Sequence, residues 1–125
     1  MQSPDFNTHG FLRVAAATPV VSIADPMTNA EAILVELQDL SEQNVAVAVF
    51  PELCLSGYSA EDLFFAENLL GDCRQALVLL AQRSPLPLCA VGIPWRLTDG
   101  RLLNCAALIG NGKVLGMVPK SVQPN

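Results

Sequence analysis

The sequence predicts an α/β fold, in which helices cover a sheet whose first strands are parallel. Short apolar runs alternate with longer segments whose apolar residues recur at helical spacing, as in strand–helix–strand units. The run "VAVAVF" at 45–50 has no polar alternation, which is typical of a parallel strand that is buried on both faces. A length of 125 residues predicts one domain or a piece of one.

The first helix is predicted from its start signal and its periodicity. A short strand is expected at 11–18, after a loose leader at 1–10. Asp25 is a suitable N-cap, and Pro26 suits the first helical position because its missing N–H would have no partner there. Apolar residues then recur on one face, so we expect a helix over about 26–43 that covers the sheet.

A second helix and a third strand are predicted in the same way. Ser59 can cap the helix, with Asp62 at its third position. An apolar stripe at helical spacing runs from Leu69 to Leu80. The apolar segment 86–95 follows and predicts the third strand.

The remaining sequence predicts two successive hairpins. The turn signals "TDG" at 98–100 and "GNG" at 110–112 separate apolar runs at 101–109 and 113–118. A strand–helix–strand connection normally gives parallel strands, and two hairpins reverse the chain twice. The second, third and fifth strands should therefore end at the same edge of the sheet.

Three chemically different residues follow these three strands. Each apolar run stops at a proline, and the next residue is Glu52, Trp95 or Lys120. Ligands of open α/β sheets bind beyond the carboxyl ends of the strands, so Glu52 and Lys120 are candidate site residues. The alternative is a strand end that merely returns to solvent, and this is our expectation for Trp95.

Charge and composition limit the classes of partner. The net charge is −5, from 12 acidic and 7 basic residues, and no segment carries a basic run, so neither nucleic acid nor an anionic membrane is expected as a partner. The first ten residues are polar and do not resemble a signal peptide. No apolar run approaches the roughly 18 residues of a membrane helix, and we expect a cytoplasmic protein.

The cysteines do not form a metal-binding pattern. Cys54, Cys73, Cys89 and Cys105 include no CxxC pair, and the single histidine is His9. No metal site is therefore predicted. Reduced, buried cysteines that act as small apolar side chains are the expectation.

A carboxylate beside an ammonium group suggests hydrolytic chemistry. Glu52 could accept a proton from a thiol or from water, while Lys120 could donate to an oxygen that gains negative charge. The pair lacks a nucleophile of its own. Cys54 lies two residues beyond Glu52, but a base seldom points at a neighbour on its own strand, so Cys54 is not the expected nucleophile.

Four segments, "FPELCLSGYSAEDL", "GIPW", "LLNCAALI" and "GMVPKS", resemble the nitrilase, or carbon–nitrogen hydrolase, superfamily. The extension "GYSAEDL" resembles in particular the glutaminase domain of glutamine-dependent NAD synthetases. The resemblance covers about 11–121 in register. It implies a nitrilase-like αββα sandwich, of which 11–125 would be an incomplete N-terminal half. Strands left without their second sheet would fit the apolar content of 51% and favour a homo-oligomer.

The resemblance also implies roles for individual residues. Glu52 matches the general base of the family, and Lys120 matches the lysine that stabilises the oxyanion. Tyr58 matches a position near the substrate pocket, although Gly57 and Tyr58 could serve only to shape the turn. The nucleophilic cysteine of the family lies some tens of residues beyond the lysine, so it would be absent from this chain.

The implied reaction is hydrolysis of the side-chain amide of glutamine, which supplies ammonia for NAD synthesis from deamido-NAD. ATP and deamido-NAD would bind a synthetase domain outside these residues, and no cofactor is expected in this chain. Without the nucleophile, the isolated chain is expected to be inactive. The alternatives are a stand-alone amidase or nitrilase with the same triad, and a non-catalytic fragment or interaction module.

Overall fold

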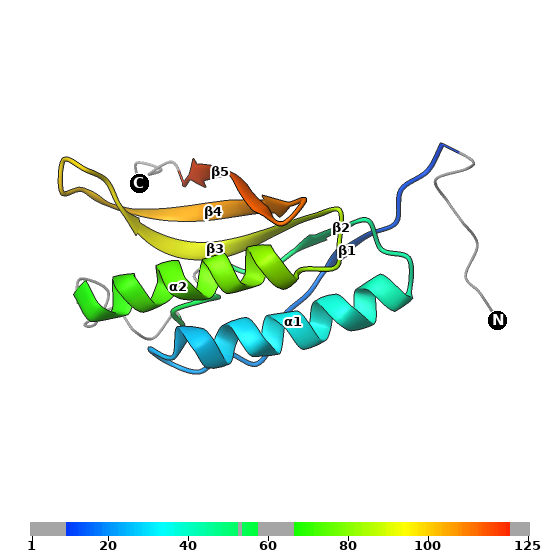
Figure 1. Cartoon of the computed structure of the whole chain (residues 1–125), viewed down its shortest axis with the longest axis horizontal. Helices are drawn as coiled ribbons and strands as arrows, with labels where there is room; N and C mark the ends of the chain where they lie inside the picture. The colour runs from blue at the N-terminus through cyan, green and yellow to red at the C-terminus, as the bar shows by residue number, and fades with distance from the viewer. Residues whose placement is uncertain (1–9, 53, 58–66, 121–125) are drawn as a thin grey trace, which may run out of the picture.

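The computed structural model describes residues 10–52, 54–57 and 67–120, which form a five-stranded sheet with two helices on one face (Figure 1). Neither helix is long and apolar enough to cross a membrane, among the residues described. In chain order the elements are β1 (Val14–Ala16), α1 (Pro26–Glu42), β2 (Val47–Val49), α2 (Glu67–Arg83), β3 (Leu88–Arg96), β4 (Leu102–Gly110) and β5 (Lys113–Pro119).

The strand order is β1-β2-β3-β4-β5, the same as the order along the chain. The strands β1, β2 and β3 are parallel, and β4 and β5 each pair antiparallel with the strand before them. The predicted pair of hairpins is confirmed. The strand β5 therefore runs in the same direction as β2 and β3, as the connection rules predicted.

The prediction that the third apolar run stops at Pro94 was wrong, because Pro94 lies inside β3. It pairs with Asn104 on β4, whose carbonyl accepts a hydrogen bond from the Lys120 amide at 2.8 Å. The backbone polar groups of Asn104 therefore point toward β5, and no donor is required from Pro94. Trp95, which we expected to return to solvent, continues β3 and packs against the core. Pro119, in contrast, is the last residue of its strand, β5.

The two faces of the sheet differ sharply in burial. Alternate residues on the face toward α1 and α2 are buried, and they are mostly apolar: Ala48, Cys89, Val91, Ile93, Cys105, Ala107 and Ile109. On the opposite face, called here the open face, Val14, Val49 and Val118 are 67%, 51% and 51% exposed. Our prediction that the second strand is buried on both faces was therefore wrong, because the helices cover only one side (Figure 1).

The start of α1 follows the predicted capping pattern. The Asp25 side chain accepts a hydrogen bond from the Thr28 amide at 3.3 Å, and Pro26 occupies the first helical position. Ile33 and Leu37 are fully buried on the face of α1 that packs toward the core. The helix ends at Glu42, one residue before the predicted limit.

Asn29, on the first turn of α1, was not singled out by the sequence. It is buried, its Oδ1 accepts from the Ser22 amide at 2.6 Å, and its Nδ2 donates to the carbonyls of Ser22 and Leu55, both at 2.8 Å. The Ala24 amide also donates to the Ser56 carbonyl at 2.9 Å. These bonds fix the segment that follows β2, and this segment carries Glu52.

Replacing Asn29 by alanine is expected to lower the free energy of unfolding by about 2–3 kcal/mol, because it leaves the buried Leu55 carbonyl and the partly buried backbone groups of Ser22 without this partner. Urea denaturation followed by circular dichroism measures the change. Asn68→Ala, which removes the same amide from an exposed position on α2, is the control and should be almost neutral. A loss below about 0.5 kcal/mol for Asn29→Ala would contradict the role given to these bonds.

Candidate active site

Glu52 and Lys120 are in direct contact. The Lys120 Nζ donates to Glu52 Oε1 at 2.7 Å, and the two side chains are 61% and 28% exposed, respectively. The predicted meeting of these two residues at one edge of the sheet is confirmed. Half-exposure of the pair leaves the site open to a substrate, and it also means that the ion pair alone contributes little to stability.

The two residues come from strands that are not neighbours, because β3 and β4 lie between β2 and β5. The segment after β2 reaches across this distance by following β3. The Phe50 amide donates to Ala90 at 2.9 Å, and the Leu55 amide donates to Gly92 at 3.2 Å. Glu52 therefore lies above β3 and reaches the first residues of β4.

A third residue, Asn104 on β4, completes the cluster and was not predicted as part of the site. Its Nδ2 donates to the same Glu52 Oε1 that Lys120 contacts. The sequence did contain a signal, because Asn104 is the only polar side chain in the strand "LLNCAALIG". A polar residue at an apolar position needs a partner. The partner, 52 residues away, is not visible in the sequence.

A cavity of about 320 Å³ adjoins the cluster on the open face of the sheet. Its walls are mostly apolar and include Val49, Ala90, Ala106 and Val118. Glu52, Asn104 and Lys120 are also among its lining residues. A largely apolar hollow with a few convergent polar groups, at the lower end of the usual ligand-site volumes of roughly 300–1,000 Å³, is suited to a small molecule.

Cys54 has the surroundings of a structural thiol. It is 1% exposed, and its Sγ accepts a hydrogen bond from the Gly92 amide at 3.3 Å. Burial raises the pKa of Cys54 from 9.0 to about 11. Since the thiolate is the nucleophilic form, these surroundings argue against Cys54 as the nucleophile.

Labelling with iodoacetamide should detect this difference. At pH 8, below both pKa values, the thiolate fraction of Cys54 is expected to be about 100-fold smaller in the folded protein than in urea, where the pKa returns to about 9. Peptide mass spectrometry of the same cysteine in the two states gives the ratio of rates, with the free peptide as a matched control. Equal rates in the two states would contradict the burial of Cys54.

The other three cysteines, Cys73, Cys89 and Cys105, are also buried, and none forms a disulfide. Burial raises the pKa of each thiol, that of Cys73 to about 12. Cys105 follows Asn104 along β4 and is among the residues that line the cavity, but it is only 4% exposed and its side chain belongs to the core on the helix side. In the described part of the chain, no group of three or more His, Cys, Asp and Glu side chains could hold a metal ion.

Tyr58 lies outside the described residues, as do Ser59 and Asp62 of the predicted helix cap. Gly57, just before Tyr58, has a φ of +87°, and a Cβ on it would lie 3.1 Å from the Ile23 Cα. Only glycine tolerates both conditions easily. This glycine therefore does shape the turn after Glu52, whatever the role of the tyrosine.

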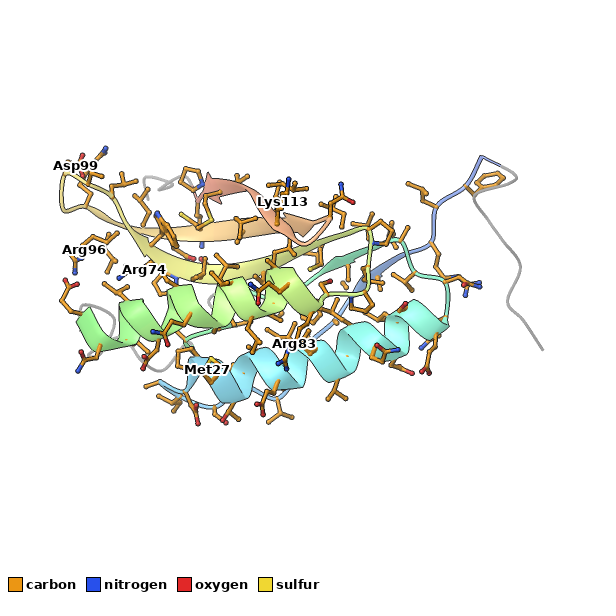
Figure 2. All side chains as sticks on the ribbon, viewed as in Figure 1. Met27, Arg74, Arg83, Arg96, Asp99 and Lys113 are labelled. Carbon is orange, nitrogen blue, oxygen red and sulfur yellow. The ribbon has the colours of Figure 1, made fainter. Side chains whose placement is uncertain are left out.

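Two further ion pairs between described residues lie outside this cluster. Arg96 forms an ion pair with Glu67 at 3.1 Å, and Asp99 forms one with Arg101 at 2.8 Å. Hydrogen bonds from Arg101 lower the pKa of Asp99. In Figure 2, Asp99 and Lys113 mark the turns at the two ends of β4. Asn104 lies nearer the Asp99 end, so Lys113 is remote from the cluster along the strand.

Comparison with known families gives one match that covers most of the chain. Residues 13–122 match the family profile described as carbon–nitrogen hydrolase. A glutamine-dependent NAD(+) synthetase from Mycobacterium tuberculosis is 45% identical over 118 residues, which are 93% of this chain and 17% of that protein. One from Aquifex aeolicus is 37% identical over 106 residues, which are 83% of this chain and 18% of that protein. The chain thus spans less than a fifth of the length of these relatives.

Solved structures give the same fold. A glutamine-dependent NAD(+) synthetase from Cytophaga hutchinsonii matches with a TM-score of 0.84 and 28% identity, over 91% of this chain and 20% of that one. An amidase from Nesterenkonia sp. matches with a TM-score of 0.76 over 91% of this chain and 44% of that one, and its 20% identity supports the fold alone. The predicted nitrilase-like fold is confirmed, present as an incomplete half with one helix layer and one sheet.

Proposed function

Because this chain belongs to the carbon–nitrogen hydrolase family, we propose that it supplies two catalytic groups to an enzyme that hydrolyses the side-chain amide of glutamine. The observation that carries the proposal is the 2.7 Å contact between Lys120 and Glu52 beside an apolar cavity. Glutamine as the substrate is supported by the relatives, which are glutamine-dependent NAD(+) synthetases.

In the proposed mechanism, Glu52 accepts the proton of a cysteine thiol, and the thiolate attacks the amide carbon of glutamine. Lys120 donates to the oxygen of the tetrahedral intermediate, which carries the negative charge. The C–N bond then breaks, and the nitrogen leaves as ammonia after it takes a proton from Glu52. Water attacks the remaining thioester with Glu52 again as base, which releases glutamate and the thiol.

The nucleophile of this mechanism is proposed to lie outside these 125 residues. All four cysteines of the chain are buried, and burial raises the pKa of each. A cysteine from another segment of the complete protein must then face the cavity, and the open face of the sheet is where such a segment would pack. We expect a second sheet to cover Val49 and Val118, whereas copies of the isolated chain would associate through the same face.

The released ammonia is proposed to serve the amidation of deamido-NAD in an ATP-dependent synthetase domain of the same protein. The relatives, which are glutamine-dependent NAD(+) synthetases, support this step. ATP and deamido-NAD would bind that domain, and this chain would need no cofactor.

The test is ammonia and glutamate release from glutamine by the full-length protein that contains this chain, and by residues 1–125 alone. The full-length protein should release both products in equal amounts, and the isolated chain should release neither. Activity of the isolated chain that is lost in Cys54→Ala would show that the nucleophile lies within it. Hydrolysis of simple aliphatic amides in preference to glutamine would favour a stand-alone amidase.

A further inference from the structure

We propose that Asn104 is a positioning residue of this site, which holds the carboxylate of Glu52 in place relative to Lys120. The inference rests on the proposed function only in its assay, because glutamine hydrolysis is the reaction that is measured. Three contacts join the three residues: Asn104 Nδ2 donates to Glu52 Oε1, Lys120 Nζ donates to the same oxygen at 2.7 Å, and the Lys120 amide donates to the Asn104 carbonyl at 2.8 Å.

The side chain of Asn104 is held more rigidly than that of Lys120. Asn104 lies on β4, the middle strand of the two hairpins, with Pro94 of β3 opposite it on one side and the end of β5 on the other. Its side chain has two rotatable bonds and is partly buried. The Lys120 side chain is 61% exposed on a flexible four-carbon stem. Of these two donors to Glu52, the amide of Asn104 therefore defines the position of the carboxylate more narrowly.

The chemistry of the contact requires a neutral donor. An ionised carboxylate only accepts hydrogen bonds, so the Nδ2 of Asn104, and not its Oδ1, faces Glu52. A neutral amide adds a hydrogen bond without a second positive charge, so the charge of Lys120 remains available to an oxyanion. Aspartate at this position would have the same shape but would place a like charge against Glu52.

The backbone of Asn104 acts on the other member of the pair. Its carbonyl holds the Lys120 amide just after β5 ends, where the chain leaves the sheet. Asn104 therefore fixes both the position of the Glu52 carboxylate and the position of the backbone from which the Lys120 side chain extends. A base and an oxyanion donor must keep a fixed separation during the reaction, and a misplacement of about 1 Å can cost on the order of 100-fold in rate.

The test compares Asn104→Ala and Asn104→Asp in the full-length protein, with ammonia release from glutamine as the assay. Asn104→Ala is expected to lower kcat by about 10- to 100-fold with KM within about threefold of wild type, because the loss affects the reacting geometry more than ground-state binding. Asn104→Asp should lower kcat further. Asn111→Gly is the matched control: it removes the same amide at the far end of β4, at a φ of +53° that glycine accepts, and should retain wild-type kcat.

Three results would overturn the inference. These are a kcat within about threefold of wild type in Asn104→Ala, a rise in KM alone, and a crystal structure of Asn104→Ala in which the Glu52 carboxylate has not moved. If Asn104→Ala does not fold, the isosteric Asn104→Asp is judged by the same criteria. A wild-type protein that does not hydrolyse glutamine contradicts the proposed function instead, and the crystal structure then still tests the position of Glu52.

Discussion

Replacing Glu52 by glutamine in the full-length protein is expected to lower glutamine hydrolysis by about 10²–10⁴-fold, the usual contribution of a general base. Glutamine is almost the same size as glutamate and cannot take the thiol proton. Its amide oxygen can still accept from Asn104 and Lys120, both of which donate to Glu52 Oε1. The substitution therefore removes the basic group while it keeps the contacts that hold this part of the site together.

The rate of ammonia release at saturating glutamine measures this loss, and KM reports whether binding has changed. Glu42→Gln, at the exposed end of α1, is the control and should leave the rate unchanged. Glu52→Gln within about tenfold of wild type would contradict the role of base. If synthesis of NAD from added ammonia fell equally, Glu52 would have a structural role in the whole protein.

The meeting of Glu52 and Lys120 could be predicted because it depends on connectivity. A helix between two strands and two tight turns leave few possible directions for the strands. Two residues that follow strands of the same direction are then at the same edge, even though 68 positions separate them. The sequence alone did not indicate how Glu52 would reach past the intervening strands, β3 and β4. It does so because backbone hydrogen bonds hold the segment on either side of Glu52 along β3.

The two wrong predictions have a common physical reason. Each feature depends on how the strands pair or on which face of the sheet is covered, and neither is written in the local sequence. Pro94 reads as a strand end, but a proline disrupts a strand only where its nitrogen would face a partner, and this is set by the register with Asn104. The apolar run 45–50 is typical of a strand that is buried on both faces. In this chain the helices cover one face only, and Val49 on the other face is 51% exposed. Its composition therefore fits a strand that a further sheet covers in the complete domain.

Asn29 and Asn104 were missed for a different reason. Each makes bonds to a segment far along the chain, at separations of 26 and 52 residues. The local sequence pattern shows only that a polar residue occupies a position where an apolar one is expected. Both bonds act on the segment that carries Glu52, so the residues that the sequence did not predict are the ones that contact this segment from elsewhere in the fold.

Lys120 provides the second large effect, and the size of the loss depends on which group replaces it. In the proposed mechanism Lys120→Ala removes a donor to the developing oxyanion, and it is expected to lower kcat by about 10²–10³-fold. Lys120→Arg keeps the charge but replaces a compact ammonium with a larger planar group. If the 2.7 Å contact to Glu52 were only a surface ion pair, arginine would preserve it and the rate would hardly change. An oxyanion donor must instead place its proton within a few tenths of an ångström, so we expect arginine to restore little of the activity that alanine loses.

The measurement is glutamine hydrolysis by full-length Lys120→Ala and Lys120→Arg, beside Lys113→Ala and Lys113→Arg as controls. Lys113 is an exposed lysine at the start of β5, the strand that Lys120 follows, and Figure 2 labels it beside the turn between β4 and β5. Its variants should keep the wild-type rate. Synthesis from added ammonia separates chemistry from folding, because it does not need the amide to be hydrolysed. A Lys120→Arg protein that hydrolyses glutamine nearly as fast as wild type would exclude the oxyanion role. Since Lys120 and Glu52 share one contact, the double variant Glu52→Gln with Lys120→Ala should lose much less than the product of the two single losses, as expected for groups that act as a unit.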